Sequence, residues 1–252
     1  FTGLFTGAFV TAVVQSSTVT TVLLVGFISS RLMSLSQSIA VILGADIGTT
    51  FTAQILAFDI SEYALLPIFI GFILFYFSRK AKFKHIGHAI MGIGFIFFGI
   101  ALMSESMYPL RSYQPFIDVI ATLANPLYGI IAGAIFTAVT NSSAATLAVV
   151  IALASQGLLS LEVGIALTLG ANIGTCLTAS LAAVGKSREA VRAATAHVLF
   201  KVLGVLLILP FLPQFSSFVL SISPRAPETL TGIGALAHEV PRQVANAHTL
   251  FN

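Results

Sequence analysis

Two short polar motifs interrupt otherwise apolar stretches of this sequence. Residues 15–18 read Gln-Ser-Ser-Thr, and residues 141–143 read Asn-Ser-Ser. Their hydroxyl and amide groups can donate hydrogen bonds to an anion or offer oxygen atoms to a hard cation. If each motif begins a helix, the first free backbone N–H groups and the positive end of the helix dipole point at the motif. The two motifs are therefore candidates for an anion site that needs no arginine, with hydroxyls from Ser16, Ser17, Thr18, Ser142 and Ser143.

A second pair of motifs reads Gly-Ala-Asp-Ile-Gly-Thr-Thr at residues 44–50 and Gly-Ala-Asn-Ile-Gly-Thr at residues 170–175. We expect the glycines to loosen their helices and free backbone carbonyls, although close helix packing also uses such glycines. Asp46 would place a carboxylate in the middle of a membrane, where a charge is costly and usually functional. With these motifs come oxygen atoms for a cation such as Na⁺, from Asp46, Thr49, Thr52, Asn172, Thr175 and Thr178.

The composition indicates which class of protein carries these motifs. Of the 252 residues, 57% are hydrophobic and only 8% are charged, with a mean hydropathy of +1.00. A soluble domain of this size needs far more charge on its surface, so a cytosolic enzyme, a nucleic-acid binder and a disordered chain are excluded. A single cysteine, Cys176, permits no intrachain disulfide. No catalytic motif stands in a usable context, so we do not expect an enzyme.

The apolar stretches predict an all-α polytopic membrane protein. About 20 apolar residues cross a bilayer as a helix. The stretches at 7–30 and 127–154 are each split by a polar motif into halves that are too short to cross. Each therefore predicts a re-entrant helical hairpin or a broken helix, which membranes tolerate where the backbone is buried in protein or lines a wet cavity.

The chain also repeats itself. Of the 55 residues from Gly3 to Ala57, 24 are identical to the residue 126 positions later. Chance would give only a few identities, and the polar motifs fall in register. Internal repeats of this kind are typical of transporters.

Charged loops indicate that the two repeats are inverted. The loop at 79–84 is strongly basic and should be cytoplasmic. The loop at 58–62 carries Asp59 and Glu62, whereas the equivalent loop at 185–192 carries Lys186, Arg188 and Arg192. Three crossings would separate the repeats if each hairpin returns to its own side, and the hairpin tips would then meet near the midplane. We expect one transport domain over 1–252, divided as follows: repeat one 1–58 (hairpin 7–30, helix 35–57), connecting helices 63–103, repeat two 127–184 (hairpin 127–154, helix 158–184), and 193–252 with a further helix, an external loop and the start of a last helix.

These four motifs, together with Ala-Asn-Ala-His-Thr-Leu-Phe-Asn at 245–252, resemble the paired signatures of the type II sodium–phosphate cotransporter family. The resemblance covers most of the chain. It implies sodium-coupled uptake of inorganic phosphate by alternating access, with phosphate held between the two tips. It implies that Na⁺ is held by residues of the second copy of each motif, at 141–143 and from 170 onward, which here are Asn141, Ser142, Thr175 and Thr178, and we add Gln15 from the first tip.

Two departures from the family pattern bear on the cation. Asn141 stands where the family has Gln and is one methylene shorter, and Asp46 stands where the family usually has Asn. We place Asp46 on the cation side, because a carboxylate beside phosphate would repel it. His197 and Lys201 lie four residues apart, and we expect them at the membrane interface with a snorkelling side chain.

The leading hypothesis is a secondary transporter of phosphate and Na⁺ in the plasma membrane, which would be a bacterial inner membrane. There are three alternatives. The protein carries another oxyanion, it couples transport to protons through Asp46 instead of to Na⁺, or it is an anion channel. Expected partners are phosphate, sodium as the coupling ion, and the lipid bilayer, without nucleic acid. A monomer and a homodimer both remain open.

Overall fold

A computed structural model gives the fold of residues 1–58 and 63–252, and every regular element in these two ranges is a helix. The loop charges Asp59 and Glu62 lie outside the described residues. The elements are α1 Thr2–Val14, α2 Ser17–Ser29, α3 Leu35–Leu56, α4 Leu65–Phe77, α5 Ala81–Ser106, η2 Tyr108–Ser112, α6 Gln114–Thr122, α7 Pro126–Thr140, α8 Ser143–Ser155, α9 Leu161–Ala183, α10 Arg188–Ile208, η3 Leu209–Phe211, α11 Leu212–Ile222 and α12 Ile233–Phe251.

Several helices are long and apolar enough to cross a membrane. Among the described residues there are four such spans, Leu35–Leu56, Ala81–Ser112, Leu161–Ala183 and Arg188–Ile222. A fifth forms if α6 and α7, which meet at a bend of 107°, are taken together. Helices α1, α2, α4 and α8 are apolar but only 13 residues long. The chain is therefore an all-α, multi-pass membrane protein.

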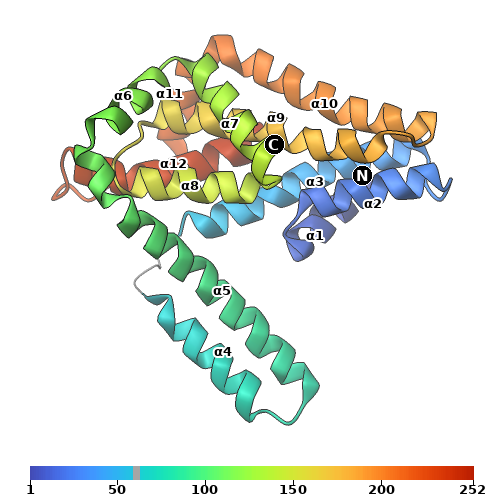
Figure 1. The fold of residues 1–252 in the computed structure, drawn as a ribbon, viewed down its shortest axis with the longest axis horizontal. Helices are drawn as coiled ribbons and strands as arrows, with labels where there is room; N and C mark the ends of the chain where they lie inside the picture. The colour runs from blue at the N-terminus through green and yellow to red at the C-terminus, as the bar shows by residue number, and fades with distance from the viewer. Residues whose placement is uncertain (59–62) are drawn as a thin grey trace.

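Two groups of three helices form the centre of the molecule. In Figure 1, α1 and α2 lie at one end of the bundle, α3 and α9 run along its length, and α10 and α12 lie against these long helices. Helix α1 packs along α3, and α7 packs along α9 in the same way. The α4–α5 pair projects away from this bundle (Figure 1), and most of its large apolar side chains are exposed.

Helices α3 and α9 run in opposite directions. The turn before α3 lies beside the turn after α9. The contact that shows this is a hydrogen bond of 3.4 Å from the Ser187 backbone N–H to Ser29 Oγ. The first turns of α3 share an apolar cluster with Ala183, at the last residue of α9. The last turns of α3 share another cluster with the first turns of α9. The basic residues Arg31 and Lys186, one in each turn, therefore lie at the same end of the bundle.

The motif glycines hold the long helices against their neighbours. A Cβ added to Gly44 would lie 2.0 Å from the carbonyl oxygen of Leu4, and one added to Gly170 would lie 2.0 Å from that of Ile130. Conversely, a Cβ on Gly7 would lie 2.1 Å from the carbonyl oxygen of Val41. Backbones in membrane helix pairs approach this closely only through small residues.

The expected loosening of the two long helices is wrong. Both α3 and α9 are continuous α-helices through their glycine motifs. The physical reason is that α1 and α7 fill the space beside the glycines, so these residues support close packing instead of freeing carbonyls. The last helix, α12, begins at Ile233 and continues to Phe251.

This packing predicts that Gly44→Ala and Gly170→Ala destabilise the protein. The added methyl groups must push the paired backbones apart, so we expect a loss of about 1–3 kcal/mol or more for each. Gly26→Ala is the matched control, because a Cβ there meets no atom within 4 Å and alanine favours a helix by about 1 kcal/mol. The melting temperature of each detergent-purified variant measures the loss of stability in Gly44→Ala and Gly170→Ala and the effect of the control, Gly26→Ala. Equal melting temperatures for all three variants would contradict the packing role.

Candidate functional site

The first hairpin turns at Gln15 and Ser16, between α1 and α2. Gln15 closes α1 in the left-handed conformation (φ 58°, ψ 25°), and Ser16 is extended (φ −149°). Ser16 Oγ caps α2 by accepting the Val19 backbone N–H at 3.2 Å. The first backbone bond of α2 is Thr20 N–H to Ser16 C=O at 3.3 Å, so the N–H groups of Ser17 and Thr18 precede the helix ladder and point out of its end.

The second hairpin, between α7 and α8, has the same geometry. Asn141 is left-handed (φ 54°, ψ 25°) and Ser142 is extended (φ −146°). Ser142 Oγ accepts the Ala145 backbone N–H at 3.1 Å. The hydroxyl oxygens of Ser16 and Ser142 accept from their own helices, which leaves both hydroxyl protons free to be donated to a ligand.

Next to each tip, two buried threonines form a hydrogen bond between the two half-helices. Thr11 and Thr20 share a hydroxyl hydrogen bond of 3.0 Å between α1 and α2. The repeat equivalents, Thr137 and Thr146, share one of 2.6 Å between α7 and α8. Because these bonds are buried, they fix the two half-helices of each hairpin relative to one another.

The tip amides are held by threonines of the long helices. Thr52 Oγ1 of α3 donates to Gln15 Oε1 at 2.8 Å, and Thr178 Oγ1 of α9 donates to Asn141 Oδ1 at 2.8 Å. The shorter Asn141 side chain therefore makes the same contact as Gln15. Each tip thus presents an amide oxygen and a threonine hydroxyl as one unit.

The two tips meet around a small cavity of about 40 Å³. That is space for roughly three water molecules, the size class of one small ion. None of the residues lining it is charged: Gln15, Ser16, Ser17, Thr18, Thr49, Thr52, Asn141, Ser142, Ser143, Ala144 and Leu147. Since two helices begin here, their dipoles and free N–H groups favour an anion in the cavity.

The cavity contains most of the residues that the sequence singled out. All five candidate phosphate ligands line it, as do Gln15, Thr49 and Asn141 among the candidate sodium ligands. Thr178 reaches it through Asn141. Besides Thr178, three candidates do not line it. Thr175 is buried with its hydroxyl on the Ala171 carbonyl at 2.9 Å, and Asp46 and Asn172 belong to a separate cluster.

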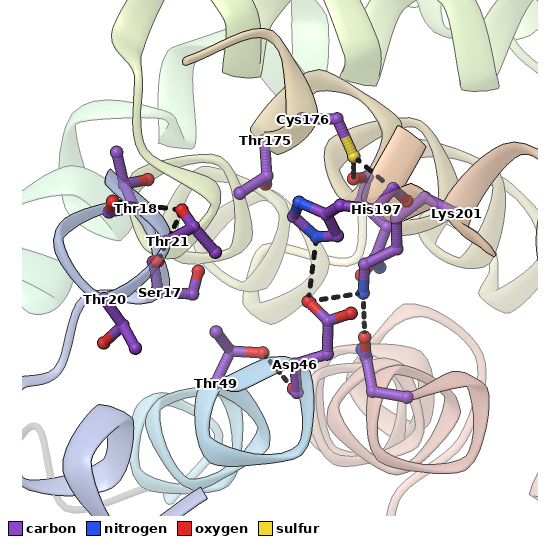
Figure 2. Close-up of polar contacts among 12 residues, drawn as sticks. Ser17, Thr18, Thr20, Thr21, Asp46, Thr49, Thr175, Cys176, His197 and Lys201 are labelled. Carbon is purple, nitrogen blue, oxygen red and sulfur yellow. Dashed lines mark hydrogen bonds and ion pairs between the residues drawn. The ribbon is translucent and has the colours of Figure 1, made fainter. Parts of the chain in front are cut away.

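Asp46 faces away from the tips and is paired within the bundle. Its Oδ1 lies 3.0 Å from Lys201 Nζ and 3.3 Å from His197 Nε2. Figure 2 shows this group on the far side of Thr49 from Ser17 and Thr18. The expectation that His197 and Lys201 lie at the membrane interface is wrong. They are 1% and 5% exposed, because the Asp46 carboxylate supplies a buried counter-charge.

Sequence reasoning did not place Lys201, His197 and Asn252 in one cluster. One available signal was a second, shorter repeat: Ala-His-Val-Leu-Phe-Lys at 196–201 and Ala-His-Thr-Leu-Phe-Asn at 247–252. The two segments lie on α10 and α12, and both histidines are buried. Their last residues meet, since Lys201 Nζ donates to Asn252 Oδ1.

Comparison with protein families gives one match. The sequence pattern of the Na⁺/Pi-cotransporter family matches residues 1–105 and 115–224. These ranges contain both hairpins, both glycine motifs and α10. No solved structure matches this chain.

Individual relatives agree with this match. The chain is 34% identical to YqeW of Bacillus subtilis over 215 residues, which is 85% of this chain and 70% of that protein. It is 35% identical over 206 residues to YjbB of Escherichia coli, named a candidate inorganic phosphate export protein, covering 81% of this chain but 38% of YjbB. It is 30% identical over 139 residues to the human sodium-dependent phosphate transport protein 2B, covering 51% of this chain and 20% of that protein.

Proposed function

The chain belongs to the Na⁺/Pi-cotransporter family, and from this premise we propose that it carries inorganic phosphate across a membrane together with Na⁺. The observation that carries the proposal is the uncharged cavity between two helix N-termini. A family of phosphate transporters needs an anion site, and this cavity is lined by residues of both hairpins.

We place phosphate between the two tips. The free N–H groups of Ser17, Thr18 and Ser143 and the hydroxyls of Ser16, Ser17, Ser142 and Ser143 can all donate to its oxygens. Hydrogen bonds to a charged ligand contribute about 1.5–3 kcal/mol each. Without a fixed cation, the site can bind phosphate and still release it, as transport requires.

We place Na⁺ beside the phosphate, on the amide–threonine units. Gln15 with Thr52, and Asn141 with Thr178, offer side-chain oxygens at the edge of the same cavity, and Thr49 and Ser142 line it. Hard cations prefer such oxygen ligands. A cation at this edge would offset the negative charge of phosphate, which gives a physical basis for moving the two together.

We further propose that the two repeats cross the membrane in opposite directions and that the bundle works by alternating access. The antiparallel course of α3 and α9 supports this, because inverted repeats place a shared site near the midplane. The end with Arg31 and Lys186 would face the cytoplasm of a bacterial plasma membrane, by the positive-inside rule, together with the basic turn at 79–84.

Proteoliposome uptake tests the coupling. Purified protein should take up radiolabelled phosphate faster with an inward Na⁺ gradient than with choline, because Na⁺ entry drives the cycle. Excess sulfate and arsenate in parallel assays report the selectivity for the oxyanion. Equal uptake in both salts would exclude sodium coupling, and net efflux from loaded vesicles under the same gradient would favour export, the activity that the name of YjbB suggests.

Removing a tip hydroxyl should weaken phosphate binding. Ser17→Ala and Ser143→Ala each remove a donor from the cavity, so the apparent affinity for phosphate should fall roughly tenfold or more. Ser36→Ala is the control, because Ser36 is exposed and lies away from the cavity. Concentration-dependent uptake at fixed Na⁺ measures the change. Unchanged affinity in both tip variants, at equal expression, would place phosphate elsewhere.

Membrane orientation can be read by cysteine labelling. In a Cys176→Ala background, Lys186→Cys should react with a membrane-impermeant maleimide only from the cytoplasmic side. Glu228→Cys should react only from outside, because it is exposed in the loop between α11 and α12, which we expect to be external. Intact cells and inverted vesicles give the two comparisons. Labelling of both cysteines from one side would refute the proposed topology.

A further inference from the structure

A second polar cluster lies inside the bundle, apart from the tip cavity. It consists of Asp46 on α3, Asn172 on α9, Lys201 on α10 and Asn252 directly after α12, and we call it the crossing cluster. Asp46, Asn172 and Lys201 are 4–6% exposed. Figure 2 shows the Lys201 ammonium between the Asp46 carboxylate and a neighbouring side chain.

The cluster is built from two equivalent halves. Asp46 and Asn172 occupy the same position of the long repeat, 126 residues apart. Lys201 and Asn252 occupy the same position of the shorter repeated segment. One member of each pair is an uncharged Asn, and the other is charged. The two charged members form an ion pair of 3.0 Å, and His197 Nε2 lies 3.3 Å from the same carboxylate oxygen.

Three side-chain oxygens converge on the Lys201 nitrogen. Asp46 Oδ1 and Asn172 Oδ1 each lie 3.0 Å from Nζ, and Asn252 Oδ1 also accepts from it. The amide orientations are fixed, because Asn172 Nδ2 donates to the Thr168 carbonyl at 3.0 Å and Asn252 Nδ2 to the His248 carbonyl at 2.9 Å. Both amide oxygens are therefore directed at the cation.

We propose that the crossing cluster is a monovalent-cation site in which the Lys201 ammonium takes the place of a free ion. One carboxylate and two amide oxygens are the hard ligands that alkali cations use in proteins. The buried Asp46 carboxylate requires a positive partner, and Lys201 supplies one that is covalently attached, beside His197 Nε2 at 3.3 Å from the same oxygen. If the ammonium is removed and its space left open, a free Na⁺ should bind in its place.

The surroundings leave room for such an exchange. A cavity of about 280 Å³ adjoins the cluster and is lined by Asp46, Lys201 and Asn252 together with apolar side chains. It shares no lining residue with the tip cavity. The aromatic ring of Phe251 lies 5.6 Å from Nζ and adds a cation–π contact.

This inference does not rest on the proposed transport function. A tethered ammonium cannot leave with a substrate, so the crossing cluster contributes no transported ion in this chain. Its test can therefore use protein stability in the absence of phosphate and of any gradient.

The test compares Lys201→Asn with two controls. Lys201→Asn removes the ammonium, opens the site and copies the equivalent residue, Asn252. Lys201→Met removes the charge but fills the space with a side chain of similar length. The double variant Asp46→Asn, Lys201→Asn opens the space but removes the carboxylate. For each, the melting temperature in detergent is measured in NaCl and in choline chloride at equal ionic strength.

We expect Lys201→Asn to be stabilised by Na⁺ over choline by roughly 3 °C or more beyond any shift of the wild type. Both controls should show only the wild-type shift. The proposal is overturned if Lys201→Asn shows the wild-type shift, or if either control gains the same stabilisation. If Lys201→Asn folds in NaCl but not in choline chloride, the result supports the proposal. If Lys201→Asn folds in neither salt, a free cation cannot replace the ammonium, and the proposal is overturned.

Discussion

The helix breaks at Gln15 and Asn141 are the constraint on which the rest of this structure depends. Each break leaves backbone N–H groups without a carbonyl partner inside an apolar protein. In hydrocarbon these groups would cost several kcal/mol each. They must therefore lie where protein or a ligand surrounds them, and bringing two breaks together makes one polar cavity between the tips.

Close helix packing makes these breaks stable. The half-helices α1 and α7 cannot span a membrane, so each depends on a long helix for support. The glycines of α3 and α9 let the backbones come so near that no side chain fits between them. The threonine pairs and the amide–threonine contacts then fix each tip against its helix. Each tip therefore has side-chain hydrogen bonds to neighbouring helices where the regular backbone bonding is interrupted.

Much of this site could be predicted from the sequence, because the signals were local. A polar motif in the middle of an apolar stretch indicates a hairpin, and its recurrence 126 residues later gives the partner tip. The role of the glycines could not be predicted. Glycine permits both a loosened helix and a close approach, and only the presence of α1 beside Gly44 decides between them. Lys201 was equally ambiguous, because its neighbour Asp46 is 155 positions away in sequence (201 − 46).

The two repeats are nearly identical at the tips but differ in charge at the crossing cluster. The difference follows from what the side chains face at each site, a shared cavity at the tips and one another at the crossing cluster. At the tips, both halves face one cavity, and each presents an equivalent serine-capped helix N-terminus to it. At the crossing cluster, the side chains face each other across the bundle. Four uncharged amides there could only form hydrogen bonds, whereas one carboxylate and one ammonium also attract each other across the helices. This attraction cross-links α3 and α10, and no residue of the crossing cluster lines the cavity between the tips.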